Sequence, residues 1–126
     1  MYCGIDIIEV NRIKEAILKN EKFKYKIFSK NEIDSIEVVN SSIKYQRYAG
    51  RFSAKEAIFK SISNILNPKN IIFEFNKIEI LNDNNGKPYI NYLDENIKDI
   101  MKEYNTDVSI SHIKETATSI AIVTKK

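Results

Sequence analysis

Glu56 and Lys60 form the charged pair in this sequence that is best placed to do chemistry. They are four residues apart in a stretch with helical spacing, so their side chains are neighbours on one helix face. Phe52 and Phe59 flank this face, where simple exposure to water would be unfavourable. Two interpretations follow: a surface ion pair worth about 0.2–0.5 kcal/mol, or a charged pair inside an aromatic-lined cleft.

Asp6 is an acid in an unusual setting, within a short isoleucine-rich segment, residues 2–8, that we predict to be a β-strand. Because strand side chains alternate between faces, Asp6 shares a face with Gly4 and Ile8, and Cys3 lies on the opposite face. Such an acid either faces a turn at the sheet edge or serves as a metal ligand or phosphate-site acid on a rigid element. The strand by itself leaves both interpretations open.

A group of basic residues follows this strand, on or just after a helix predicted at residues 12–19 with Asn11 as its N-cap. The group consists of Arg12, Lys19, Lys22 and Lys26. It is either a solvated face or a docking surface for an acidic protein helix, and both interpretations are kept.

The element that must position Glu56 and Lys60 is a long helix predicted over residues 43–63. Asn67-Pro68 stops it, because proline cannot continue a helix. Its apolar stripe, which we expect to face the core, consists of Ala54, Ile58, Ile62 and Ile65. The long helix is therefore expected to be packed on one side and chemically active on the other.

A shorter helix precedes the long one. Ser29 with Glu32 three residues later is a capping-box signature, which opens a helix ending at about Val38. Asn40 and the two serines after it break the helical pattern, and either serine can cap the long helix.

The C-terminal half changes to a strand-like pattern. We predict strands at residues 77–81, 87–92, 107–113 and 118–123, and a helix at residues 93–104. Asn85-Gly86 is a strong hairpin signal, because both residues tolerate positive φ. Pro88 places its strand at a sheet edge or gives it an irregular start. His112, the only histidine, lies near the end of the third of these strands and is either structural or part of a site.

Length and composition favour one domain spanning residues 1–126. Hydrophobic residues make up 43% and charged residues 29%, a balance that excludes wholesale disorder. The formal charge of +3 is too mild to identify a partner. No apolar run is long enough to span a membrane, and Asp6 and Glu9 interrupt the region where a signal peptide would be apolar, so we expect a soluble, cytoplasmic protein. The single cysteine, Cys3, suits a reducing compartment and is expected to be a small core residue.

Several separated segments match one family together, in order and in spacing. Through them the chain resembles holo-acyl-carrier-protein synthase, the small bacterial type of 4′-phosphopantetheinyl transferase. The segments are residues 4–13; residues 28–32; residues 49–57, with Arg-Phe-Ser-Ala-Lys-Glu-Ala, together with Lys60; Asn85-Gly86-Lys87-Pro88; and residues 109–112, Ser-Ile-Ser-His. The resemblance covers essentially the whole chain and implies an α+β fold in a single domain, with an antiparallel sheet packed against a long central helix.

The resemblance also implies an activity, the transfer of 4′-phosphopantetheine from coenzyme A to a serine of apo-acyl-carrier protein in fatty acid biosynthesis, with release of adenosine 3′,5′-bisphosphate. It implies that Asp6 and Glu56 hold Mg²⁺ and that both are catalytic together with Lys60, whose charge would stabilise the leaving phosphate. The general base stays open between Glu56, Asp6 and a metal-bound water, with Glu56 or its water favoured.

Coenzyme A binding is implied for Lys60 and for residues of the other matched segments, which are Arg51, Gly86, Lys87, Pro88 and His112. Arg51 would give forked hydrogen bonds to a phosphate, and the turn at residues 85–88 would offer backbone groups near the adenosine. His112 would act there as a donor or cation rather than as a nucleophile.

The partners implied are coenzyme A and acyl-carrier protein, with no nucleic acid and no membrane. Acyl-carrier proteins are acidic, so the basic group that begins at Arg12 becomes a docking surface. The resemblance further implies a homotrimer with each site between subunits. Two alternatives remain: a non-catalytic module for nucleic acid or an acidic protein, which would not explain Asp6 and Glu56, and a transferase for peptide-synthesis carriers. The chain departs from the family in residues 63–76, which contain no glycine where a glycine-rich loop is common.

Overall fold

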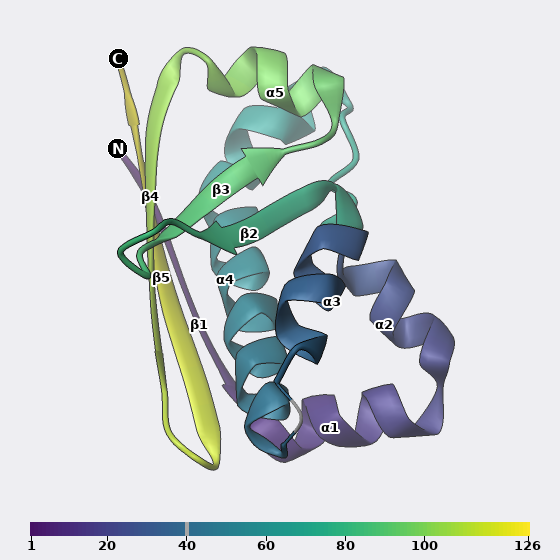
Figure 1. Ribbon diagram of the computed structural model, residues 1–126. Coiled ribbons are helices and arrows are strands. Elements are labelled where there is room, and N and C mark those ends of the chain that lie inside the picture. The colour runs from purple at the N-terminus through teal and green to yellow at the C-terminus, as the bar shows by residue number, and fades with distance from the viewer. Residues whose placement is uncertain (40) are drawn as a thin grey trace.

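A computed structural model describes residues 1–39 and 41–126 of the chain, so the predicted break at Asn40 lies outside the described residues. The elements in order are β1 (Tyr2–Glu9), α1 (Val10–Lys19), α2 (Glu21–Ile27), α3 (Lys30–Glu37), α4 (Ile43–Leu66), β2 (Ile78–Asn82), β3 (Pro88–Tyr92), α5 (Glu95–Met101), β4 (Tyr104–His112) and β5 (Thr116–Lys125). Helix α4 runs along one face of the sheet formed by β1, β4 and β5, and α1 to α3 lie on its other side (Figure 1). The predicted α+β fold, an antiparallel sheet packed with a long central helix, is confirmed.

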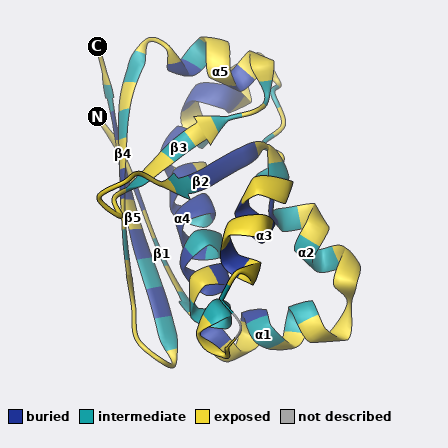
Figure 2. Ribbon diagram, in the orientation of Figure 1, coloured by how far each residue is buried: buried dark blue, intermediate teal, exposed yellow. Residues whose placement is uncertain are grey.

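Helix α4 carries the core of the molecule. Its predicted stripe, Ala54, Ile58, Ile62 and Ile65, is buried, and α4 shows dark blue stretches between teal and yellow ones in the burial view (Figure 2). The helix ends at Leu66, slightly later than predicted, where Asn67-Pro68 begins a short 3-10 turn. Ser42 makes no capping hydrogen bond, whereas the Ser41 hydroxyl accepts one from the Ile43 N–H. The stop signal is confirmed. Ser42 stands at the N-cap, and Ser41 supplies the side-chain hydrogen bond at this helix start.

Strand β1 lies against α4 with almost no space between them. A Cβ atom added at Gly4 would stand 1.9 Å from the carbonyl oxygen of Ala57, so only glycine permits this approach. The contact fixes where β1 crosses α4, and Asp6 lies on the same strand face, two residues further on. The predicted grouping of Gly4, Asp6 and Ile8 on one strand face is confirmed, and this is the face that meets α4.

The main sheet has the order β1-β5-β4, with both pairs antiparallel. Its face away from α4 is apolar and exposed: Ile5 is 63% and Ile7 is 70% exposed, beside Ile120 and Ile122 of β5. Cys3 is also exposed, so the prediction that it packs in the core is wrong. The alternation was assigned correctly, but β1 has a helix on only one of its faces.

Three local predictions differ from the structure. Glu9, not Asn11, stands at the N-cap of α1. Asn11 is the second residue of the helix, and its side chain donates to the Glu15 carboxylate. Helix α2 was not predicted. Helix α5 is shorter than expected, because Asp94 caps its start and the chain enters β4 at Tyr104.

The second sheet is the predicted hairpin of β2 and β3. Gly86 has φ +81° in the turn, as the Asn-Gly signal requires, and Pro88 begins β3. The glycine-free connection before β2 uses Asn70 in a left-handed conformation, φ 55°, to leave its 3-10 turn. Asparagine thus does there what glycine commonly does.

Candidate active site

The fold brings Asp6 of β1 together with Glu56 and Lys60 of α4. Lys60 Nζ lies 3.3 Å from Asp6 Oδ1 and donates to the Ile5 carbonyl oxygen at 2.9 Å. No ion pair between Lys60 and Glu56 is found within the described residues, so Lys60 bridges from the helix to the strand. The three side chains predicted to act together therefore share one site.

The two carboxylates of this cluster are under electrostatic strain. Across residues 1–39 and 41–126, Asp6 Oδ2 is the one buried side-chain oxygen or nitrogen without a hydrogen-bond partner. Burial raises the pKa of Glu56, the Asp6 charge raises it further, and Lys60 lowers it in part. An unpartnered oxygen beside a second carboxylate is the arrangement that a cation would stabilise.

The donor set fits a hard divalent cation held jointly with a substrate. The described residues contain no cluster of three or more His, Cys, Asp or Glu able to enclose a metal. Mg²⁺ is commonly bound through one or two carboxylates plus substrate phosphates and water. Asp6 and Glu56 match that incomplete set, with the free Asp6 Oδ2 as the direct observation in its favour.

A cluster of aromatic rings lies beside the charged residues. Phe59 packs against Phe73 with ring centroids 5.2 Å apart, and Phe73 against Phe75 at 5.0 Å. Phe52 joins the same cluster through Phe75 at 6.3 Å. Phe52 and Phe59, the two rings that flank Glu56 and Lys60 in the sequence, thus belong to one packed cluster.

A buried ion pair holds the backbone of the aromatic cluster in place at Phe75. Lys55 Nζ lies 2.6 Å from Glu32 Oε1 and donates to the carbonyl oxygens of Ile27 at 2.8 Å and Phe75 at 2.7 Å. Both charged side chains are fully buried. Glu32 Oε2 also accepts from the Ile80 N–H at 2.9 Å. The network joins α2, α3, α4, β2 and the aromatic segment.

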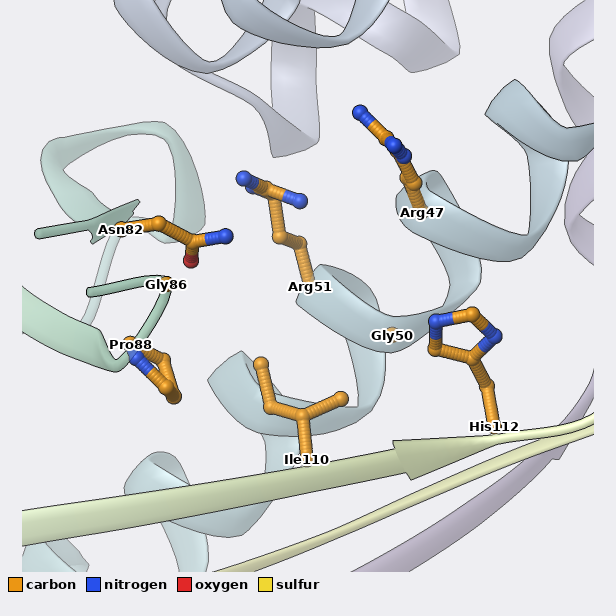
Figure 3. A pocket seen from close by; sticks show the side chains of 8 residues that line it. All are labelled: Arg47, Gly50, Arg51, Asn82, Gly86, Pro88, Ile110 and His112. Carbon is orange, nitrogen blue, oxygen red and sulfur yellow. The ribbon is translucent and has the colours of Figure 1, made fainter. Parts of the chain in front are cut away.

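A separate pocket of about 310 Å³ opens between α4, the β2–β3 hairpin and β4 (Figure 3). It contains four residues predicted from the resemblance, namely Arg51, Gly86, Pro88 and His112. It also contains Arg47, Gly50, Asn82 and Ile110, for which no role was predicted. None of Asp6, Glu56 and Lys60 lines this pocket. The predicted site residues therefore divide into two groups on the chain.

Neighbouring groups hold the pocket's nitrogen-bearing side chains in place. Arg51 Nε donates to the Ile80 carbonyl oxygen at 3.1 Å, and His112 Nδ1 lies 2.9 Å from Gln46 Oε1. Burial lowers the pKa of Arg51, and the neighbouring charge of Arg47 lowers it further, against the opposing effect of Glu32. The Arg51 guanidinium and the His112 imidazole both line an opening large enough for a small ligand.

Lys87 lies apart from its predicted group. Its ammonium is 2.9 Å from Asp107 Oδ1 on β4, and it lines a second pocket rather than the one containing Arg51. The ion pair is exposed, and it lowers the pKa of Asp107. An exposed pair of this kind is weak, so Lys87 can exchange partners.

The predicted docking residues lie on α1 and α2. Arg12, Lys19, Lys22 and Lys26 are all exposed, and none forms an ion pair with another described residue. The ribbons of both helices carry much yellow in the burial view (Figure 2).

Sequence reasoning missed Arg47, Gly50 and Asn82. The signal for Arg47 was its spacing, one helical turn before Arg51, which places both guanidinium groups on one face. Gly50 lies between them, and a Cβ atom there would come within 3.1 Å of Ile110 Cγ2. No pattern pointed to Asn82, because its place depends on how the hairpin packs against α4.

Comparison with known proteins gives a consistent result. Residues 2–121 match the family model described as the 4′-phosphopantetheinyl transferase superfamily. The chain is 41% identical to a holo-[acyl-carrier-protein] synthase of Fusobacterium nucleatum, with 95% of each chain covered. It is 40% identical to the enzyme of the same name from Clostridium acetobutylicum, with 95% of this chain and 94% of the relative covered.

Solved structures agree with these relatives. A holo-(acyl-carrier-protein) synthase of Bacillus anthracis in complex with CoA (3′,5′-ADP) is 31% identical, with TM-score 0.78, covering 99% of this chain and 96% of that one. The Helicobacter pylori enzyme in complex with coenzyme A is 25% identical, with TM-score 0.75, covering 97% of this chain and 99% of that one.

Proposed function

Because this chain belongs to the 4′-phosphopantetheinyl transferase superfamily, we propose that it transfers 4′-phosphopantetheine from coenzyme A to a serine of apo-acyl-carrier protein. The observation that carries the proposal is the cluster of Asp6, Glu56 and Lys60, with Asp6 Oδ2 buried and unpartnered in the described chain. A binding module for nucleic acid would have no use for two carboxylates in this state. Matching relatives cover nearly the whole chain, so the activity belongs to the same unit.

The reaction requires one bond to form and one to break. The serine oxygen of the carrier attacks the phosphorus atom that bears pantetheine, and the bond from that phosphorus to the bridging oxygen of the pyrophosphate breaks. The electron pair leaves with adenosine 3′,5′-bisphosphate. The protein supplies no nucleophile, so its task is to position the groups and to stabilise charge.

Asp6 and Glu56 would hold Mg²⁺, which when bound neutralises charge on the pyrophosphate. Lys60 is placed to add a positive charge beside them, since its ammonium is half-exposed and can turn from Asp6 toward a phosphate oxygen. In that position it would stabilise the leaving phosphate. Magnesium as the physiological ion is part of the proposal.

We assign the serine proton to Glu56 or to a water held by it. A carboxylate held on a rigid helix beside the reacting groups is a common general base. Asp6 is less suited, because one of its oxygens is engaged with Lys60.

The nucleotide end of coenzyme A is assigned to the pocket of Arg51, Gly86, Pro88 and His112, with Lys87 available from its exposed pair. This pocket shares no lining residue with the Asp6 cluster. A homotrimer with sites between subunits would let the pocket of one subunit serve the carboxylates of the next. The exposed isoleucine face of the β1-β5-β4 sheet supports such an assembly.

The carrier protein is assigned to the exposed basic residues of α1 and α2, Arg12, Lys19, Lys22 and Lys26, which would meet its acidic helix. Among the described residues, no helix combines the length and the apolar character needed to cross a membrane. The exposed thiol of Cys3 is compatible with a reducing compartment, and we place the reaction in the cytoplasm.

Mass spectrometry of apo-acyl-carrier protein tests the activity directly. After incubation with this protein, coenzyme A and Mg²⁺, we expect the carrier to gain the mass of one phosphopantetheine. Asp6→Ala and Glu56→Ala should abolish the gain, while Glu95→Ala, an exposed carboxylate on α5, should preserve it. No gain with the wild type, in Mg²⁺ or Mn²⁺, would refute the transferase.

A further inference from the structure

Arg47 and Arg51 lie one turn apart on α4 and line the same pocket (Figure 3). Arg51 is anchored through Nε to the Ile80 carbonyl oxygen, which leaves its two terminal nitrogens available. Arg47 is exposed, and its guanidinium forms no hydrogen bond or ion pair with any residue that the structure describes. Two guanidinium groups thus border one opening with donors to spare.

The pocket has no negative charge of its own. Its other lining residues are Gly50, Asn82, Gly86, Pro88, Ile110 and His112, and none is a carboxylate. Arg47 and Arg51 are like charges one helical turn apart at the same opening, and no carboxylate of the pocket lining stands between them. An anion bound between them would remove their repulsion and gain forked, charge-assisted hydrogen bonds.

The rest of the pocket is suited to the neutral part of a nucleotide. Ile110 offers an apolar surface, Asn82 offers an amide, and the turn at Gly86 leaves room close to the backbone. Formal charge is thus confined to the α4 side of the pocket, apart from the titratable ring of His112. A ligand that combines a nucleoside with one separate phosphate matches this division.

We propose that Arg47 acts with Arg51 to bind the 3′-phosphate of coenzyme A, and that Arg47 makes this protein prefer coenzyme A over dephospho-coenzyme A. The inference rests on the proposed function and adds a specificity-determining residue to it. Arginine is suited to this role, because its planar fork gives two parallel hydrogen bonds to one phosphate.

Calorimetric titration with two nucleotides isolates the interaction. Adenosine 3′,5′-bisphosphate and 5′-AMP differ only in the 3′-phosphate, so the ratio of their dissociation constants measures its contribution. Arg47→Ala should weaken the bisphosphate by about 10- to 100-fold, the usual range for a lost hydrogen bond to a charged group. It should weaken 5′-AMP by less than about twofold, because the remaining pocket is unchanged.

Two further variants sharpen the measurement. Arg47→Lys keeps the charge but loses the fork, so its affinity for the bisphosphate should lie between those of wild type and Arg47→Ala. Lys98→Ala removes an exposed cation from α5, far from the pocket in sequence, and should leave both affinities unchanged. Melting temperatures close to that of wild type would show that the fold is retained, as expected for truncation of an exposed side chain.

The outcomes separate this inference from the proposed function. If Arg47→Ala weakens both nucleotides equally, or neither, the inference is wrong, while transfer by the wild type keeps the proposed function. If Arg47→Ala raises only the KM for carrier protein, Arg47 belongs to docking and the inference is again wrong. If the wild type binds neither nucleotide nor coenzyme A and transfers nothing, both fail.

Discussion

Asp6 combines two environments in one side chain. One oxygen is paired with Lys60, and the other is buried without a partner in the described chain. We expect Mg²⁺ at about 100 times its dissociation constant to stabilise the protein by about 2.7 kcal/mol, because the ion binds the folded state only. A thermal-shift titration of metal-free protein would show this as a melting temperature higher by a few degrees.

Asp6→Asn and Glu56→Gln should lose this response to Mg²⁺. Without the metal, Glu56→Gln should be at least as stable as wild type, because it removes a charge that burial and Asp6 disfavour. Glu95→Gln, an exposed control, should respond as wild type does. An undiminished shift in Glu56→Gln would show that the ion binds elsewhere.

A substitution of Arg12 tests whether the exposed basic residues of α1 and α2 bind the carrier protein. Arg12→Glu reverses an exposed charge, so it should raise the KM for carrier protein by about tenfold or more through like-charge repulsion. Coenzyme A binding, measured by calorimetry, should stay near the wild-type value. Equal loss of both would remove Arg12 from the docking surface.

At the residue scale, sequence reasoning identified Asp6, Glu56 and Lys60 through the resemblance, because short motifs carry them. Helical spacing alone gave Lys60 the wrong partner, since the ion pair runs to a strand distant in sequence. Arg47 was missed for a related reason. It lines a pocket whose opposite wall is the β2–β3 hairpin, which is distant from it in sequence.

The buried pair Lys55–Glu32 determines how the elements pack around α4. Lys55→Met should destabilise the protein by about 3–5 kcal/mol, because Glu32 keeps a charge in the core with no cation beside it. Urea unfolding monitored by circular dichroism would measure this. Adding Glu32→Gln should recover part of the loss by removing that charge. A double variant as unstable as the sum of the two single changes would show that the pair is not coupled.

Glu37 joins α3 to its neighbours and should make their packing depend on pH. It accepts from the Tyr48 hydroxyl at 2.7 Å and from Lys44 at 3.3 Å, and lies 3.9 Å from Lys24. Burial raises the pKa of Glu37, but these three partners outweigh it and the net pKa is lowered. A lowered pKa means that the folded state holds the proton less well, so this stability is present at neutral pH and lost in acid.

We therefore expect Glu37→Gln to cost about 0.5–1 kcal/mol at pH 7, a small value because the side chain is partly open to solvent. Unfolding at a series of pH values should show the difference from wild type shrinking as the pH falls below about 4.3, the ordinary pKa of a glutamate, where the unfolded state takes up its proton first. The difference should be lost once the pH is below the lowered pKa of Glu37 in the folded state. A difference that does not change with pH would mean that the charge of Glu37 contributes nothing.

At the element scale, the capping box, the long helix and the Asn-Gly hairpin were predictable because local residues determine them. Helix α2 was not, since it has only seven residues and its apolar side consists of Phe23 and Ile27, which are partly buried against the core. Its start was nevertheless signalled by Asn20, whose side chain accepts from the Lys22 N–H.

At the scale of the whole molecule, the face of the β1-β5-β4 sheet away from α4 exposes isoleucines, and we expect another subunit to cover it. Ile5 and Ile120 are direct neighbours across β1 and β5, and both point away from α4. If the proposed trimer forms through this face, Ile120→Glu should convert it to monomers with loss of turnover, while the fold survives because the side chain is exposed. Size-exclusion chromatography with light scattering measures this.

Ile72→Glu is the matched control, since Ile72 is 77% exposed and outside the sheet, and it should leave the mass unchanged. A monomeric wild type with full turnover would contradict the trimer. The alternation of β1 was readable from the sequence, but which face a helix covers was not, because that depends on the path of the chain after β1.

Because α4 is one unbroken helix, it fixes both the distance and the relative direction of the charged groups along it. Arg51 and Glu56 belong to the same unbroken helix, so their separation along its axis is about 7.5 Å, and their directions are set by its pitch. Inserting a single alanine between them would rotate everything after it by about 100°. Homologous chains should therefore vary in length before or after α4 and remain the same length within it.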